Sequence, residues 1–143
     1  MIYFDAAFVA KFYLDEPESD AVRALAFKAS EVASSELTKI ELASVFHRKF
    51  REQIVGDKGR ADLGKQFKSD CEAELWIFLP VTSPLLDQTG EKINHLPRTT
   101  FLRASDALHL TTAAENGFKE IYSNDRHLLA AARHFGLKGV NVV

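Results

Sequence analysis

Short apolar runs alternate with longer amphipathic segments along the chain, and this alternation predicts the elements of the fold. The short runs predict buried strands at residues 2–4, 32–34, 75–79 and 121–123, with a further edge strand at residues 140–143. Apolar residues three or four positions apart, such as Val22, Leu25 and Ala29, predict helices between the strands. We expect helices over residues 8–14, 18–29, 37–50, 57–72, 85–96, 104–116 and 126–135.

The order of these elements indicates an α/β fold. Strands that alternate with helices favour a parallel sheet with helices on both of its faces. We therefore expect a three-layer sandwich whose central, mostly parallel sheet has four to five strands. Pro80 and Pro97 end a strand and a helix, and Gly136 is a candidate cap for the last helix. The chain has 143 residues, which is the length of a single domain over residues 1–143.

The composition is that of a soluble globular protein, with 46% hydrophobic and 27% charged residues. No apolar run approaches the roughly 20 residues that a membrane span needs, and the first residues lack the basic region of a signal peptide. Cys71 is the only cysteine, which excludes an internal disulfide and a thiolate-rich zinc site. We therefore expect a cytoplasmic protein without membrane association.

The distribution of charge matters more than its sum. The net charge of −2 is unlike the basic character of most nucleic-acid-binding domains. Lysine and arginine nevertheless concentrate between Arg48 and Lys68. This segment is either a basic face that binds phosphates or the ordinary solvated exterior of helices, and the sequence does not separate the two.

Four acidic residues lie where the expected strands end or the expected helices begin. Asp5 directly follows the first strand, and Asp125 lies between the fourth strand and the last helix. Glu41 and Asp106 lie in the first turns of two other helices. In a parallel sheet Asp5 and Asp125 share one edge, and Glu41 and Asp106 can face that edge from flanking helices.

Three of the four acids also have a purely structural interpretation. Thr38 and Glu41 have the spacing of a capping box, and Asp125 can be the N-cap of the following helix. Asp106 suits the positive end of a helix dipole. Asp5 has no such explanation, because a strand end has no dipole that favours a carboxylate.

A metal site explains the four acids together. Carboxylates gathered without cationic partners repel one another and take up protons. A hard divalent cation removes this repulsion, and oxygen-only ligands suit Mg²⁺ or Mn²⁺. Two such ions can activate a water for attack on a phosphodiester phosphorus and stabilise the 3′ oxygen as it leaves.

The segments that carry these acids resemble the four motifs of PIN domains. They are MIYFD at residues 1–5, TKIELAS at 38–44, RASDALHL at 103–110 and SNDRHL at 123–128. They are most similar to the VapC toxins of bacterial toxin–antitoxin pairs. The order and spacing of the motifs and the chain length agree, so the resemblance covers essentially the whole chain.

The resemblance implies a PIN-like sandwich and a metal-dependent endoribonuclease, a hydrolase of RNA phosphodiester bonds. It implies that Asp5, Glu41, Asp106 and Asp125 bind Mg²⁺ or Mn²⁺, and that the Ser123 hydroxyl accompanies the last acid. It also implies a VapB-like antitoxin that covers the site, and a homodimer. Basic side chains would bind the RNA phosphates, with Arg48 and Arg103, and also Lys49 and Arg51, as candidates.

One departure from the family pattern bears on activity. VapC-like proteins usually carry Thr or Ser just after the first Asp, where this chain has Ala6 and Ala7. A hydroxyl at these positions would help to orient the first carboxylate or the water at the metal. The departure keeps open an alternative function, a degenerate PIN domain that binds RNA or a partner protein without catalysis.

Other kinds of site fit the sequence less well. A haloacid-dehalogenase-type site needs a second Asp where Ala7 stands, and a receiver domain needs an Asp after the third strand, where Pro80 stands. No two histidines have the i, i+4 spacing of a helical zinc site, and His109 is expected to pack in the core or support the acids. Phe8 with Phe12, and Phe46 with Phe50, have i, i+4 spacing within two helices. They indicate core or an exposed groove for an antitoxin helix or a dimer mate.

Overall fold

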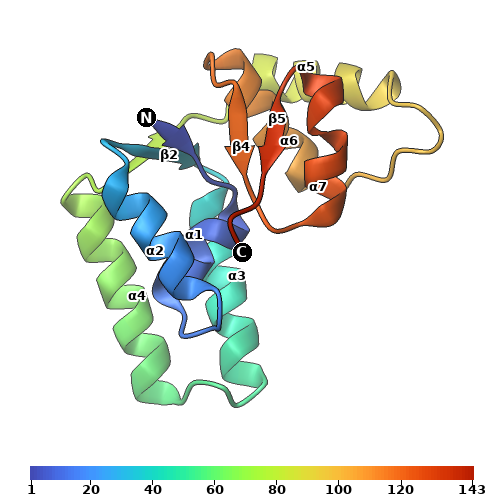
Figure 1. Cartoon of the computed structure of the whole chain (residues 1–143). Coiled ribbons are helices and arrows are strands. Elements are labelled where there is room, and N and C mark those ends of the chain that lie inside the picture. Colours follow the sequence, from blue (N-terminus) through green and yellow to red (C-terminus); the bar gives the residue numbers. More distant parts are fainter.

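Five parallel strands form the sheet at the centre of the computed structural model, which describes residues 1–143. β1 (Ile2–Tyr3), β2 (Val32–Ser35) and β3 (Trp76–Leu79) pair in the order β1-β2-β3, and β4 (Glu120–Tyr122) pairs with β5 (Lys138–Val140). A parallel bridge between Phe4 and Tyr122 joins the two groups, and the Asp5 N–H donates to the Tyr122 carbonyl at 3.1 Å. This confirms the expected parallel α/β sheet (Figure 1).

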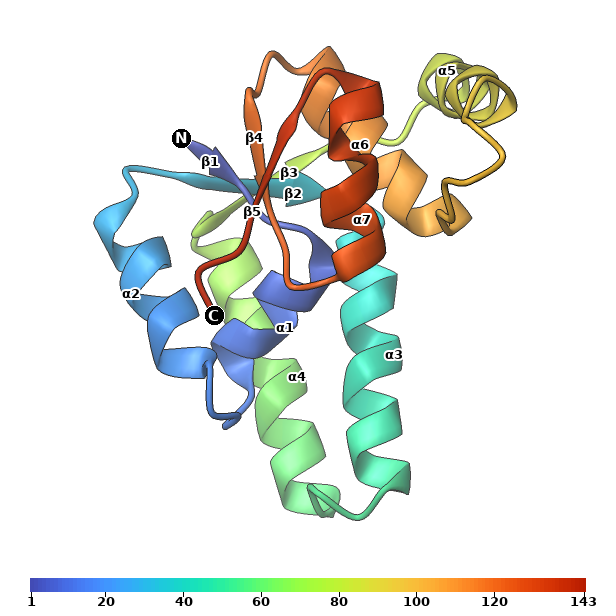
Figure 2. The same ribbon diagram turned by 45° about the vertical axis from the view of Figure 1, so that its right-hand side comes forward.

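The helices lie on both faces of this sheet. In chain order they are α1 (Ala6–Tyr13), α2 (Ser19–Lys28), α3 (Thr38–Arg51), α4 (Asp57–Glu72), α5 (Ser83–Asn94), α6 (Ala104–Glu115) and α7 (Arg126–Ala131), with a 3₁₀ turn at Ala132–Phe135. In both views α3 and α4 lie side by side and extend away from the sheet (Figure 2). No helix combines the length and the apolar composition that a bilayer crossing needs.

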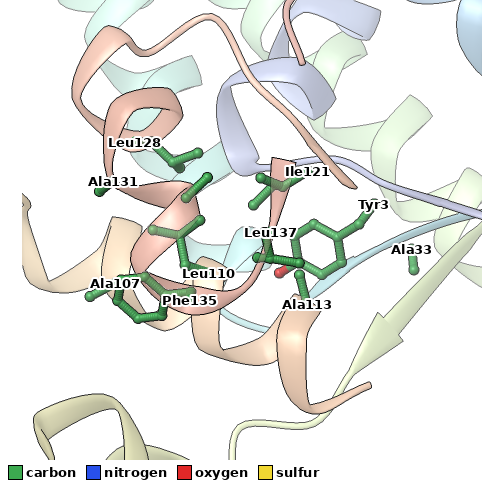
Figure 3. Close-up of a cluster of buried hydrophobic side chains, with 11 residues drawn as sticks. Tyr3, Ala33, Ala107, Leu110, Ala113, Ile121, Leu128, Ala131, Phe135 and Leu137 are labelled. Atoms are coloured by element: carbon green, nitrogen blue, oxygen red, sulfur yellow. The ribbon is translucent and has the colours of Figure 1, made fainter. Parts of the chain in front are cut away.

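Two apolar clusters show how the sheet is covered on both sides. Successive side chains of a strand point to opposite faces, so Tyr3 joins the cluster beneath α6 and α7, whereas Phe4 joins the cluster beneath α1, α2 and α3. Figure 3 shows the first cluster, which includes Tyr3, Leu110, Ile121 and Leu128. Full burial of each such side chain stabilises the fold by about 1.5–3 kcal/mol. The sheet is therefore the middle layer of the expected sandwich.

Two boundaries differ from the expectation in ways that matter. α1 begins at Ala6, two residues before the expected start, because the Asp5 carboxylate caps it by accepting from the Phe8 N–H at 2.9 Å. The last strand is Lys138–Val140, so the edge strand expected at residues 140–143 was wrong in position. Gly139 explains the shift, because a Cβ there would lie 2.9 Å from the backbone of Leu129, and only glycine lets the strand pass so close to α7.

The end of the chain confirms one expected signal and refines another. Gly136 adopts a left-handed conformation with φ of 74° and caps the last helical segment, as expected. The helix expected over residues 126–135 is divided into α7 and the 3₁₀ turn. Both segments pack on the sheet, so the divided helix still covers the face above β4 and β5.

Candidate active site at the carboxyl edge of the sheet

A pocket of about 520 Å³ lies where the strands β1 and β4 end. All four acids singled out from the sequence line it, together with two of the three arginines that were expected to bind RNA phosphates. These residues are Asp5, Glu41, Arg48, Arg103, Asp106 and Asp125. Parallel strands with right-handed crossovers bring residues from distant parts of the chain to one edge of the sheet, which is why these six meet.

Asp5 is the most deeply buried of the acids, with a relative exposure of 4%. Its Oδ1 accepts from the Phe8 N–H, and its Oδ2 accepts from the Ser123 hydroxyl at 2.5 Å. Burial raises the pKa of Asp5 to about 6, although the hydrogen bonds and His109 oppose the shift. Asp5 does cap a helix, so the expectation that it lacks a structural role was wrong, because α1 begins directly after it.

Ser123 links the first acid of the site to the last. Its side chain is fully buried, and its Oγ donates to Asp5 while accepting from the Asp125 N–H at 2.9 Å. The hydroxyl therefore fixes the Asp5 carboxylate relative to the turn that carries Asp125. The sequence placed Ser123 beside the last acid, and the structure shows that it contacts both.

Glu41 is held by histidine and not by a helix cap. α3 begins after Leu37 without a side-chain cap, and the Thr38 hydroxyl bonds to Ser34, so no capping box forms. Instead Glu41 Oε2 lies 2.7 Å from Nε2 of His109. The structural interpretation of Glu41 is therefore excluded, and its carboxylate is positioned from α6.

The His109 ring forms a buried link between Glu41 and Tyr3. His109 is 1% exposed, and its Nδ1 lies 2.9 Å from the Tyr3 hydroxyl. Burial raises the pKa of Tyr3, so this hydroxyl keeps its proton. An ionised carboxylate only accepts, so the Nε2–H of His109 donates to Glu41. His109 therefore supports Glu41, which was one of the two roles expected from the sequence.

Asp106 and Asp125 share a single cationic partner, Arg103. Arg103 Nε lies 3.1 Å from Asp106 Oδ2, and Nη2 lies 2.6 Å from Asp125 Oδ2. The other oxygen of Asp125 accepts from the N–H groups of His127 and Leu128, so Asp125 also caps α7 as its structural interpretation required. Asp125 therefore combines a helix cap with a place in the pocket.

The two acids beside Arg103 differ in their titration. Burial raises the pKa of Asp106, and Arg103 opposes that shift only in part. Partial burial acts in the same direction on Asp125, but the backbone N–H groups of Leu128 and His127 prevail and lower its pKa. Asp125 is therefore charged at neutral pH, whereas Asp5 and Asp106 lie in surroundings that disfavour their charged forms.

The four carboxylates fit a hard divalent cation in their chemistry and in their shared pocket. They offer only oxygen donors, and burial, with a smaller contribution from a neighbouring carboxylate, raises the pKa of Asp5 and of Asp106. A bound cation would favour their charged forms. As they stand, no three His, Cys, Asp or Glu side chains lie close enough together to hold one ion. Arg103 pairs with two of them, so its positive charge opposes a cation bound between Asp106 and Asp125.

The basic residues expected to contact RNA have different surroundings. Arg48 lines the pocket with an exposed side chain, whereas Lys49 is largely covered and paired with Glu16 at 2.9 Å. Arg51 does not line the pocket. On α4 the lysines mostly pair along the helix, as Lys58 does with Asp62, which favours the solvated exterior over a basic face.

The pocket wall also includes residues outside the four motifs. Lys11 and Glu16 line the pocket as a partly buried ion pair at 3.0 Å, and no periodicity or motif indicated them. Phe8 of α1 and Phe46 of α3 are buried in the core, which agrees with the interpretation of the phenylalanine spacing as ordinary core packing. Ala6 and Ala7 line the pocket where a hydroxyl residue is usual.

Comparisons with known proteins agree with this geometry. The PIN domain family matches residues 2–134. Ribonuclease VapC47 of Mycobacterium tuberculosis is 28% identical over 142 residues, which cover 95% of this chain and 93% of that protein.

Two solved structures share the fold, each with a TM-score of 0.69. One is VapC20 of Mycobacterium tuberculosis, a toxin that cleaves the sarcin-ricin loop, with 19% identity and coverage of 92% of this chain and 95% of that one. The other is FitAB bound to a DNA fragment, with 15% identity and coverage of 99% and 94%. These identities establish a common fold.

Proposed function

The chain belongs to the PIN domain family, and from this premise we propose that it is a metal-dependent endoribonuclease that acts as a VapC-like toxin. The convergence of Asp5, Glu41, Asp106 and Asp125 on one pocket carries the proposal. The similarity to Ribonuclease VapC47 along nearly the whole chain supports it. The substrate class is therefore RNA, and the reaction is hydrolysis of a phosphodiester bond.

Two of the four acids are already oriented by neighbouring groups. Mg²⁺ or Mn²⁺ at these carboxylates would supply the charge that activates a water and stabilises the oxygen that leaves the phosphorus. Ser123 and the Phe8 N–H orient Asp5, and His109 orients Glu41. The entropy cost of fixing these two carboxylates is therefore not added to the cost of binding RNA. Arg48, exposed at the pocket, is placed to bind a phosphate of the RNA backbone.

The proposal includes the setting in which such a nuclease acts. We place the protein in the cytoplasm as a homodimer, where a VapB-like antitoxin covers the pocket and inhibits cleavage. These points rest on the resemblance to VapC toxins. Co-expression with the cognate antitoxin should suppress RNA cleavage, and the pocket residues should become protected from solvent in the complex.

RNA cleavage by the purified protein tests the proposal. Total RNA is incubated with Mg²⁺ or Mn²⁺ and the new ends are sequenced, and a few dominant cleavage sites are expected. Chelation with EDTA should abolish cleavage, and Asp106→Asn should reduce it on the order of 10³-fold or more, since it removes a metal ligand. Asp87→Asn, the same substitution on the exposed face of α5, is the matched control. Unchanged cleavage by Asp106→Asn contradicts the assignment.

A degenerate PIN domain without catalysis is the second candidate function. Ala6 and Ala7, which leave no hydroxyl beside Asp5, favour it. Calorimetric titration with Mn²⁺ separates the two functions, because a degenerate site binds no ion. Binding of Mn²⁺ that is lost in Asp106→Asn excludes this alternative.

A further inference from the structure

Arg103 occupies an unusual position in the pocket. It is the residue before α6, with an extended backbone, and its side chain turns back across the first turn to Asp106. The same guanidinium reaches Asp125, 22 residues further along the chain. Its side chain remains 60% exposed, so the ion pair is open to solvent on one side. Arg103 thus balances two of the four acids from the rim of the pocket.

The arginine and a metal ion would compete for the same atoms. Asp125 Oδ1 accepts from two backbone N–H groups, so Oδ2 is the oxygen that remains for a ligand. Arg103 Nη2 bonds to that Oδ2 at 2.6 Å. On Asp106, Nε likewise approaches Oδ2. An ion that takes either oxygen into its coordination therefore competes with a guanidinium N–H for that oxygen and is repelled by the positive charge beside it.

We propose that Arg103 is an exchangeable counter-ion, which pairs with Asp106 and Asp125 in the metal-free protein and leaves them when a divalent cation binds. The released guanidinium, still at the rim of the pocket, is then free to bind a phosphate of the substrate. This inference rests on the proposed function and adds a role for a residue outside the acidic set. It makes metal binding and exposure of a phosphate-binding group a single coupled event.

The coupling has a measurable size. If metal binds only to molecules in which the ion pair is broken, the apparent Kd equals the intrinsic Kd divided by the fraction of such molecules. A solvent-exposed pair is weak, so this fraction is not small and the effect is modest. For a pair of this exposure we expect Arg103→Met to bind Mn²⁺ about 3- to 10-fold more tightly than the wild type. Methionine keeps the length of the stem and removes every N–H donor.

Calorimetric titration of the metal-free protein with Mn²⁺ alone tests the exchange. Arg126→Met is the matched control, because Arg126 is exposed and adjacent to Asp125, so the same positive charge is lost without loss of the bridge. We expect a change of less than about 2-fold in that control, which measures the general effect of charge. Arg103→Lys keeps the charge but not the two-pronged contact, and its affinity should lie between wild type and Arg103→Met.

Thermal unfolding provides a second readout that a merely structural role would not produce. In EDTA, Arg103→Met should unfold at a lower temperature than the wild type, because Asp106 and Asp125 lose their counter-ion. At saturating Mn²⁺ this deficit should disappear, because the ion then balances both acids. An arginine that only stabilises the fold would show the same deficit in both conditions.

The outcomes separate this inference from the proposed function. Wild-type binding of Mn²⁺ with equal or weaker binding by Arg103→Met overturns the exchange and leaves the nuclease proposal standing. Absence of Mn²⁺ binding in both proteins overturns the exchange together with the metal dependence. Tighter binding by Arg103→Met than by Arg126→Met, with a stability deficit confined to EDTA, supports the exchange.

Discussion

The two pairs of acids in the pocket are held in different ways. Asp5 accepts from two uncharged donors, the Phe8 N–H and the Ser123 hydroxyl, and Glu41 accepts from the ring of the buried His109. Asp106 and Asp125 instead share the charged side chain of Arg103. Hydrogen bonds from uncharged groups fix a carboxylate without neutralising it, whereas an arginine neutralises it and competes with other cations. The first pair is therefore a fixed half-site, and the second pair is an exchangeable one.

The two half-sites also lie on different parts of the sheet. Asp5 and Glu41 follow β1 and β2, and Asp125 follows β4, in the other hydrogen-bonded group of strands. The bridge between Phe4 and Tyr122 and the contact between Ser123 and Asp5 connect the groups at this point. The pocket is thus built across the junction of the two strand groups, and its geometry depends on that junction.

Asp5→Asn is expected to have the largest effect, because it removes the most buried oxygen ligand of the fixed half-site. Asparagine can still accept from the Phe8 N–H through its carbonyl oxygen, so α1 keeps its cap. We expect metal-dependent RNA cleavage to fall on the order of 10³-fold or more. Initial cleavage rates are measured beside circular dichroism spectra, and a folded variant with wild-type rates would contradict the role of Asp5.

The stability of the metal-free protein should depend on pH in a direction set by Asp5. Folding raises the pKa of this carboxyl from 3.8 to about 6, so the folded state binds its proton more tightly than the unfolded state does. This contribution is complete below pH 4 and is lost as the pH rises through 6, which amounts to at most about 3 kcal/mol. Asp106, whose pKa is also raised, acts in the same direction.

Urea unfolding in EDTA between pH 4 and pH 7 measures this dependence, as the difference between wild type and Asp5→Asn. We expect the wild type to lose stability relative to the variant as the pH rises, and Mn²⁺ at pH 7 to restore it. A difference that does not change with pH would show that Asp5 titrates normally in the folded protein.

His109→Leu should weaken the fixed half-site without removing a ligand. The substitution leaves the buried Tyr3 hydroxyl and the Glu41 carboxylate without their shared partner. Loss of such a supporting contact is expected to reduce Mn²⁺ affinity about 10- to 100-fold. His109→Gln keeps a donor and an acceptor and should recover part of the affinity, whereas His95→Leu, on an exposed residue, is the control. Equal affinities for Leu and Gln at position 109 would contradict a positioning role.

The smallest effect is expected from restoring the missing hydroxyl. Ala7 is half-buried and lines the pocket two residues after Asp5. Ala7→Ser should raise Mn²⁺ affinity by about 3-fold, because a hydroxyl there can orient Asp5 or a water at the ion. Calorimetric titration measures the change. Weaker binding by Ala7→Ser would show that the fixed half-site is already complete without that hydroxyl.

The sequence predicted the order of the elements and the membership of the acidic set, since both depend on signals local to short segments. Hydrophobic periodicity gave the strands and helices, and the four motifs gave the acids that line the pocket. The start of α1 was placed too late because the cap lies in Asp5, which was assigned to a strand end. The last strand was placed too late because the close passage of Gly139 over Leu129 is a property of packing.

The contacts that distinguish the half-sites could not be predicted in the same way. The link between His109 and Glu41 spans 68 residues, and the link between Arg103 and Asp125 spans 22 residues. Such pairs depend on which helix faces which strand end and on the rotamers that packing allows. The sequence named Arg103 as a candidate for phosphate, and only the structure shows it bound to two acids.

The contact between Ser123 and Asp5 joins residues 118 positions apart, and this separation has a consequence for protein synthesis. While the ribosome is still translating the region before β4, the emerging polypeptide carries Asp5 and Glu41 but neither Asp125 nor the serine that orients the first acid. If the proposed function is correct, a nascent chain at this stage has an incomplete active site and cannot cleave the RNA of the ribosome that translates it. Nuclease activity then appears only after the segment that carries Ser123 and Asp125 has been synthesised and has folded against Asp5.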